Sequence, residues 1–178
     1  MTFDSAKQRW AAISNRTRTT LGVALLTVAV AIGLAFCAPR AQATSLTDFL
    51  ENALINHLFR GTAYTAPGTW FVSLHTSACS DSATGTEVTG GSYARVGVAS
   101  GTGTWAAPSA GNGTTSNVNA INYATPTAGW GTVTHFALWD ASTAGNQLIC
   151  QALTASKTIN SGDTVSFPAG SLTVQIDN

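Results

Sequence analysis

The stretch that most constrains the fold is residues 130–140, Trp-Gly-Thr-Val-Thr-His-Phe-Ala-Leu-Trp-Asp. Four large apolar side chains alternate only loosely with threonine and histidine in it: Val133, Phe136, Leu138 and Trp139. Both faces of an extended chain would therefore carry apolar groups, which is expected of a strand covered on two sides. Small polar residues at 140–145 suit a hairpin turn, and residues 147–153 can pair straight back. We predict that this hairpin forms the centre of the core.

The rest of the chain reads mostly as short strands separated by turns rich in Gly, Ser, Asn and Pro. We expect these strands at residues 69–76, 93–100, 103–107, 117–123, 132–140, 147–153, 157–160, 164–167 and 171–176. Such spacing is typical of an antiparallel sandwich or barrel and not of a parallel sheet with crossover helices. Because no repeat or low-complexity linker divides residues 44–178, we predict a single domain there.

One amphipathic helix is predicted at residues 45–60, with Ser45 or Thr47 as its cap and acidic residues in its first turns. Its apolar residues recur at three- and four-residue spacing: Leu46, Phe49, Leu50, Ala53, Leu54, Leu58 and Phe59. A helix of about four turns is marginally stable alone, so we expect its apolar face to dock on the sheet; surface recognition is the less frequent alternative. The predicted fold is a mainly β, antiparallel, jelly-roll-like sandwich with this N-terminal amphipathic helix packed on it.

Residues 1–43 differ from the body of the chain. Basic residues come first, an almost wholly apolar run fills residues 21–38, and Ala41-Gln42-Ala43 matches the small-x-small pattern of signal cleavage. Three interpretations remain open: a cleaved signal peptide, a membrane anchor through residues 21–38 if uncleaved, and a non-native N-terminal extension from an over-long reading frame. None of them gives residues 1–43 a role in the folded domain.

Charge and composition narrow the class of protein. Charged residues make up 9% of the chain, whereas Thr, Ser, Gly and Ala are abundant, as in β-rich extracellular or virion proteins. From Thr44 onward, seven acidic residues stand against three basic ones. A nucleic-acid-binding surface would need a basic excess, so no nucleic-acid partner is expected.

The search for catalytic motifs is negative, with no Gly-x-Ser-x-Gly, Walker loop, His-Glu-x-x-His or Cys-x-x-Cys. The histidines, His57, His75 and His135, fall on separate predicted elements, so no metal site is expected. Asp81 and Glu87 are the only local acid pair for glycoside hydrolysis, and acids in a loop are usually solvated turn residues. We predict a protein that is not an enzyme and holds no cofactor.

Two of the three cysteines fall in the predicted domain: Cys79 in a loop and Cys150 in a strand. In an oxidising compartment they can form a disulfide, which would stabilise the fold by roughly 3–5 kcal/mol because it closes a long loop. The alternative is a buried free thiol at Cys150 and an unpaired Cys79.

Five blocks, in order, resemble a family of small phage virion proteins that are often labelled tail-fibre-like: residues 45–68, 70–76, 85–95, 130–140 and 152–163. The resemblance covers about residues 45–177. It implies a β-sandwich virion component without enzymatic activity, in a tail-fibre or head-decoration position, whose partners are other virion proteins and further copies of itself. A contribution to attachment to host-surface saccharide is a further expectation. The alternative is a secreted carbohydrate-binding or adhesion module that uses the signal peptide.

The expected contact surface is the loop at residues 77–91, because it is longer than a simple hairpin needs. Its candidate contact residues are Asp81, Thr84, Glu87 and Thr89. Trp105 is added because an indole beside a polar loop can stack on a sugar ring, although a half-buried position in the sandwich is commoner.

Overall fold

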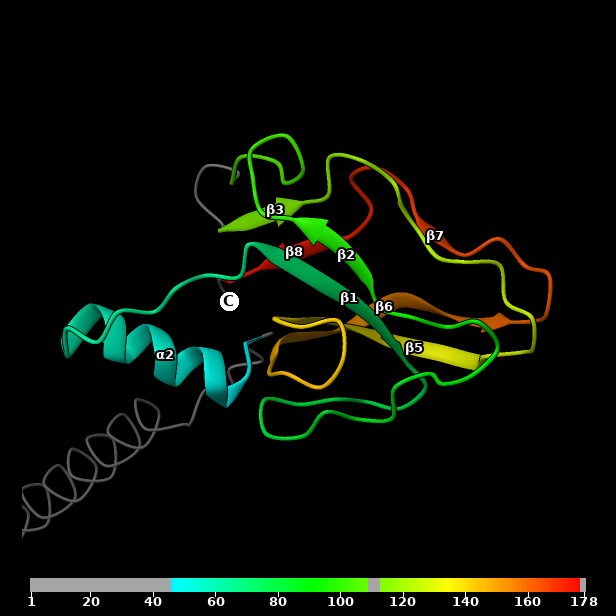
Figure 1. Ribbon diagram of the computed structural model, residues 1–178, viewed down its shortest axis with the longest axis horizontal. Coiled ribbons are helices and arrows are strands. Elements are labelled where there is room, and N and C mark those ends of the chain that lie inside the picture. The colour runs from blue at the N-terminus through cyan, green and yellow to red at the C-terminus, as the bar shows by residue number, and fades with distance from the viewer. Residues whose placement is uncertain (1–45, 109–112, 177–178) are drawn as a thin grey trace, which may run out of the picture. The chain divides into compact units, whose positions relative to one another are not determined.

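The computed structural model describes residues 46–108 and 113–176, so the segment predicted at 1–43 and the cap Ser45 lie outside the described residues. The described chain is mainly β, with one helix, α2, at Asp48–Phe59 (Figure 1). The strands are β1 Thr69–His75, β2 Val96–Ala99, β3 Thr114–Ser116, β4 Ile121–Asn122, β5 Gly131–Trp139, β6 Gln147–Ile159, β7 Ser166–Phe167 and β8 Thr173–Gln175. The predicted class, mainly β with antiparallel pairing and one helix, is confirmed.

The strands form one larger sheet and two small ones, all antiparallel. The larger sheet has four strands in the order β2-β1-β5-β6, and the small sheets pair β3 with β8 and β4 with β7. The small sheets contribute Ile121, Phe167 and Val174 to the same apolar cluster as the larger sheet. The core therefore lies between two layers, although the sheets are small and unclosed.

Strand β5 is covered on both faces, as predicted from its sequence. Phe136 and Leu138 on one face are 4% and 2% exposed, and Ala137 and Trp139 on the other are 0% and 6% exposed. The first pair packs in the apolar core, where full burial of such a side chain contributes roughly 1.5–3 kcal/mol. The second pair faces the loop at residues 77–91, described below.

Several predicted strands differ from the structure: the strand predicted at 117–123 is reduced to β4, and β3 was not predicted. Residues 103–107 form a turn with a single bridge from Trp105 to Asn117, because the Thr104 hydroxyl closes the chain on the carbonyls of Ala99 (2.6 Å) and Gly101 (2.9 Å). The strands predicted at 147–153 and 157–160 are one strand, β6. A shift of register opposite β5, between Val133 and His135, lets both halves of β6 pair with it.

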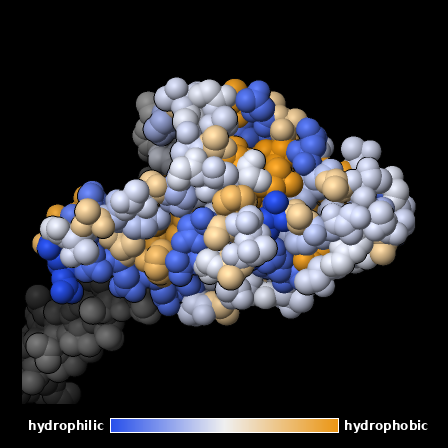
Figure 2. All heavy atoms as spheres, in the orientation of Figure 1, coloured by the Kyte–Doolittle hydropathy of each residue, from blue (hydrophilic) through white to orange (hydrophobic). Residues whose placement is uncertain are grey.

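Helix α2 contacts the sheet through its first turn. Thr47 occupies the N-cap position but makes no side-chain cap bond, since its hydroxyl instead donates to the carbonyls of Gln147 (2.6 Å) and Leu148 (3.1 Å). Leu46, just before the helix, and Leu50 are buried, and Leu54 is half-buried against the core. Exposed apolar residues of the helix are Phe49, Ile55, Leu58 and Phe59, and hydrophobic residues appear along it in Figure 2. The expectation that the apolar face docks on the sheet thus holds for Leu50 and Leu54 and fails for the exposed residues. No helix in the described part of the chain has the length and apolar character needed to cross a membrane.

Candidate contact surface

The loop at residues 77–91, from here on the 77–91 loop, is attached to the sheet along part of its length. Its returning arm pairs with the end of β1, where the Thr76 amide donates to the Thr86 carbonyl (2.9 Å) and the Val88 amide donates to the Leu74 carbonyl (2.9 Å). Val88 is 3% exposed and belongs to the core. The loop therefore folds back over the sheet, and only its outer part remains available for contacts.

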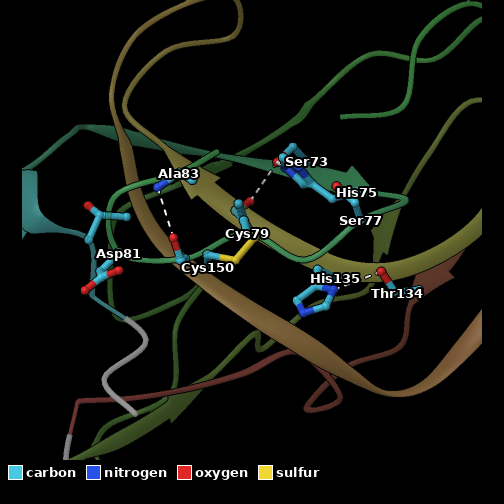
Figure 3. Close-up of a disulfide and its surroundings, with 12 residues drawn as sticks. Ser73, His75, Ser77, Cys79, Asp81, Ala83, Thr134, His135 and Cys150 are labelled. Atoms are coloured by element: carbon cyan, nitrogen blue, oxygen red, sulfur yellow. Dashed lines mark hydrogen bonds between the residues drawn. A yellow bond between two sulfur atoms is a disulfide. The ribbon is translucent and has the colours of Figure 1, made fainter. Parts of the chain in front are cut away.

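The outgoing arm of the loop is held covalently. Cys79 and Cys150 are joined in a disulfide with a Cα–Cα distance of 6.1 Å, which ties the loop to β6 (Figure 3). Two residues further on, the Asp81 carbonyl accepts a hydrogen bond from the Asp48 amide (3.0 Å) at the start of α2. One short segment of the loop thus links β6 to the helix.

A guanidinium group connects the loop to the turn at residues 140–146. Arg95 makes two charged hydrogen bonds to Glu87, Nη2–Oε2 at 2.7 Å and Nε–Oε1 at 2.9 Å. Its Nη1 donates to the carbonyls of Ala141 (3.0 Å) and Ala144 (2.8 Å), and its Cζ lies over the Trp139 ring, 3.7 Å from the ring centre. We call these contacts the Arg95 network. Bidentate pairing and stacking on an aromatic ring are arrangements that a lysine cannot reproduce.

The charges of this network are fixed by their surroundings. Burial raises the pKa of Glu87, but the hydrogen bonds and charge of Arg95 outweigh it, so the pKa lies below its usual value. Tyr93 donates to Glu87 Oε1 (3.0 Å) and accepts from the Leu74 amide (2.9 Å). Burial, with a contribution from Glu87, raises the pKa of Tyr93 well above its usual value. Glu87 thus stays ionised and Tyr93 protonated, as a structural salt bridge requires.

A second buried polar group lies on the same face of the sheet. His75 is 0% exposed, and its Nε2 lies 2.8 Å from the Ser73 hydroxyl, which also accepts a hydrogen bond from the Trp139 indole (2.7 Å). His135 pairs across the strands with His75, and both appear beside the disulfide in Figure 3. Burial, the largest influence, lowers the pKa of His75. With no exposure to solvent, the serine–histidine pair cannot reach a substrate.

The predicted contact residues lie in different places in the structure. Asp81 and Thr84 are exposed and line a shallow groove of about 210 Å³. The groove is completed by α2, the end of β5, the 140–146 turn and the start of β6, through residues that include Phe49, Trp139, Asn146 and Gln147. Thr89 is exposed outside this groove, and Glu87 lies in the Arg95 network. Trp105 is half-buried against the core, and its indole nitrogen is buried with no hydrogen-bond partner among the residues that the structure describes.

A second hollow lies on a different part of the body. It is a cleft of about 480 Å³ beside the C-terminal half of β6, with Leu74 and Val133 among its lining residues and Lys157, Asp163 and Thr164 contributing polar groups. Nothing in the sequence indicated it, because its walls come from segments far apart in the chain. Arg95 was missed for the same reason, since Ala141 and Ala144 lie 46 and 49 residues away.

Within residues 46–108 and 113–176, no group of three or more His, Cys, Asp or Glu side chains is placed to hold a metal ion. His57 accepts a hydrogen bond from the Tyr64 amide (3.2 Å), and His135 bonds to Thr134 (2.8 Å). The described residues thus form a disulfide-tied surface with a groove.

Comparison with known proteins agrees with the resemblance seen in the sequence. No curated protein matches the chain. Residues 45–175, most of the chain and all but one residue of the described body, match the family Gp80, described as podophage GP4 fiber I protein gp80. A family of this description supports a structural component of a phage virion. The chain therefore belongs to the Gp80 family of phage fibre proteins.

Proposed function

We propose that this protein is a non-catalytic structural component of the phage particle, in a tail-fibre or capsid-decorating position, and that it works in the virion outside the host cell. The observation that carries the proposal is the family match over residues 45–175, which spans the helix and all eight strands. Its partners are then other virion proteins and further copies of itself.

The build of the contact surface supports this role. The disulfide between Cys79 and Cys150 and the Arg95 network hold the 77–91 loop and the 140–146 turn against the sheet. A disulfide suits an oxidising, extracellular setting, and a rigid surface loses little conformational entropy on binding. Both properties fit a part that must keep its shape on a free particle.

The proposed location is tested on purified particles. Quantitative mass spectrometry should find peptides of residues 46–176 at a fixed copy number per particle, and labelled protein should give density at one place in a cryo-EM map. Particles that lack the protein would overturn the proposal. N-terminal sequencing of the particle-borne chain would also decide the proposed role of residues 1–43. Thr44 as first residue indicates cleavage, another start near Thr44 indicates a later reading-frame start, and a retained segment indicates an anchor or extension.

Attachment to the host is the finer part of the proposal, and we assign it to the groove that Asp81 and Thr84 line. A saccharide fits this groove because its lining offers carboxylate, amide and hydroxyl groups together with the ring of Phe49, which is 44% exposed. The alternative, a secreted carbohydrate-binding or adhesion module that uses the signal peptide, has less support, because Trp105, the tryptophan expected to stack on a sugar, is half-buried against the core.

The test replaces only exposed side chains of the groove. Particles carrying Asp81→Asn with Thr84→Ala should adsorb to the host more slowly than wild type, at unchanged protein content. The matched control changes hydroxyls of the other cleft, with Thr164→Ala and Ser166→Ala, both at exposed positions. Equal adsorption of wild-type and groove-variant particles would remove the groove from the proposal while leaving the virion role intact.

A further inference from the structure

One wall of the candidate groove is a short segment of the 77–91 loop, residues 80–84, from here on the 80–84 wall. All five of its residues are exposed, so burial of apolar surface does little to hold it in place. It has a turn of its own, in which the Ser80 amide donates to the Ala83 carbonyl (2.8 Å). The segment can therefore keep its local shape, but its position over the sheet depends on links to other elements.

A covalent and a non-covalent link join the 80–84 wall to the rest of the body. Cys79, the residue before it, is bonded to Cys150 of β6, and Figure 3 shows Asp81 beside this disulfide. The Asp81 carbonyl accepts a hydrogen bond from the Asp48 amide (3.0 Å) at the start of α2. A hydrogen bond between exposed residues contributes little net stability, because water competes for both groups. The disulfide is therefore the stronger of the two links.

The other side of the groove is formed partly by strand residues. Trp139 ends β5 and Gln147 begins β6, and both are 6% exposed. Cys150 lies three residues further along β6. The disulfide thus joins the 80–84 wall to one of the strands that form the opposite side. Reduction of this bond would free the wall while the paired strands stay in place.

We propose that this disulfide is a redox switch of the groove. Cys79 and Cys150 stay reduced in the bacterial cytosol, where phage proteins are synthesised, and the bond closes only after release from the cell. The cytosol keeps thiols reduced, whereas disulfides persist outside the cell. Both cysteines are half-buried, so an external reagent reaches them. The inference deepens the proposed function, because it names the regulation of the same site, and it rests on that function for the place of synthesis.

The closing step is a thiol–disulfide exchange with an external disulfide, such as oxidised glutathione. The thiolate of one cysteine attacks a sulfur of that disulfide and expels one thiolate, and the thiolate of the second cysteine then attacks the mixed disulfide and expels the other. The protein gives up two protons and two electrons, and the external disulfide is reduced to two thiols. Closure holds the 80–84 wall against β6, so the groove takes its binding shape only on the released protein.

The timing is tested by labelling thiols in infected cells. Cells taken shortly before lysis, and protein released after it, are quenched with acid and alkylated with N-ethylmaleimide under denaturing conditions at neutral pH. After reduction, a second alkylating agent marks the cysteines that were bonded. Mass spectrometry of the peptides that contain Cys79 and Cys150 should find maleimide on most copies before lysis and the second label on most copies after release. A bonded pair before lysis, as export to the periplasm would produce, or a free pair after release would overturn the inference.

The effect on the groove is tested by amide exchange in the full-length protein. Reduction should speed exchange of the Asp48 amide at least about tenfold, because its acceptor, the Asp81 carbonyl, belongs to the freed wall. The matched control is the Glu51 amide, whose hydrogen bond is internal to the start of the helix and should be unaffected. An unchanged rate for Asp48, or an equal rise for Glu51, would overturn the inference.

A variant without the bond separates its loss from other effects of the reducing agent. In the Cys79→Ser, Cys150→Ser protein, the Asp48 amide should exchange at the fast rate with or without reducing agent, and a slow rate there would also contradict the switch. Neither the labelling nor the amide exchange involves host binding or incorporation into particles. These readouts therefore decide the switch even where the groove variants adsorb normally or the particles lack the protein.

Discussion

The guanidinium of Arg95 lies over the indole of Trp139, 3.7 Å from the ring centre, while two of its nitrogens bond to Glu87. The stacking places one cation between the 77–91 loop and the 140–146 turn, on top of the central strand. With its side chain 8% exposed, Arg95 is almost withdrawn from water, and its charge is compensated by a carboxylate that is itself only 23% exposed. Arg95 therefore contacts both loops of the candidate contact surface at once.

Replacement of this arginine should destabilise the fold. Arg95→Ala leaves Glu87 without its partner and the carbonyls of Ala141 and Ala144 without a donor, so we expect a loss of about 3 kcal/mol in the free energy of unfolding. Arg95→Lys should lose more than half of that, since lysine provides neither the bidentate pair nor the planar stack. Urea denaturation measures both. Exposed Arg60 is the control, and a loss for Arg95→Ala no larger than for Arg60→Ala would contradict the role given to the network.

The disulfide should raise the free energy of unfolding, because it restricts the conformations of the unfolded chain. Cys79 and Cys150 are 71 residues apart, and closing a loop of that length is worth about 4 kcal/mol in the chain-entropy account. In a Cys37→Ser background, adding a reducing agent should therefore lower the urea midpoint. It should also speed amide exchange in the outgoing arm of the 77–91 loop. The doubly substituted Cys79→Ser, Cys150→Ser protein is the control, because a reducing agent has no bond to break in it. An equal response of both proteins would argue against the bridge.

Acidification should weaken the fold in two stages. The pKa of His75 is lowered by burial, with Glu87 opposing and Arg95 and His135 adding to the shift, so the unfolded chain binds a proton that the folded chain does not. Stability is therefore complete above the ordinary histidine pKa of 6.5 and falls as the pH drops below it. Glu87, also with a lowered pKa, adds a second loss below about its ordinary 4.5. Unfolding free energies measured from pH 8 down to about pH 2 should show this sequence.

Single substitutions show which histidine causes the loss of stability that begins near pH 6.5. His75→Gln should remove the decline that begins near pH 6.5, although it lowers stability at every pH because the site is fully buried. His57→Gln changes an exposed histidine and should keep the wild-type slope. If the slope near pH 6 is the same in wild type and His75→Gln, the buried histidine is not its source.

The central strand was predictable because its evidence is local: Phe136, Leu138 and Trp139 stand close together, and their loose alternation already indicates two covered faces. The exposure of Leu58 and Phe59 was not, because periodicity shows that a helix has an apolar side but not what covers it. Trp105 illustrates the same limit, since a binding and a half-buried tryptophan have the same sequence signature. The partners of Arg95 lie up to 49 residues away and are set by the tertiary fold alone.

Two adjacent glycines allow the cost of backbone strain to be measured apart from the cost of crowding by a side chain. Gly90 and Gly91 both have positive φ, at 72° and 55°, so alanine at either should cost about 1–2 kcal/mol. A Cβ at Gly90 meets nothing within 4 Å, but one at Gly91 would lie 2.8 Å from the Ala128 carbonyl and 2.9 Å from the Trp130 indole nitrogen. That nitrogen donates to the Gly91 carbonyl (3.0 Å), so the clash also disturbs the bond that seats Trp130.

Gly91→Ala should therefore cost more than Gly90→Ala in urea denaturation. The excess, on the order of 1–3 kcal/mol, is the part that comes from crowding. Tryptophan fluorescence should also shift in Gly91→Ala alone, because only there does the substitution press on Trp130. Because the two variants share the same backbone penalty, their difference isolates the contact between the end of the 77–91 loop and the aromatic group beneath it. An equal loss in the free energy of unfolding for the two variants would mean that the surroundings of Gly91 accommodate a methyl group without strain. The loop would then be held less tightly than the Trp130 hydrogen bond implies.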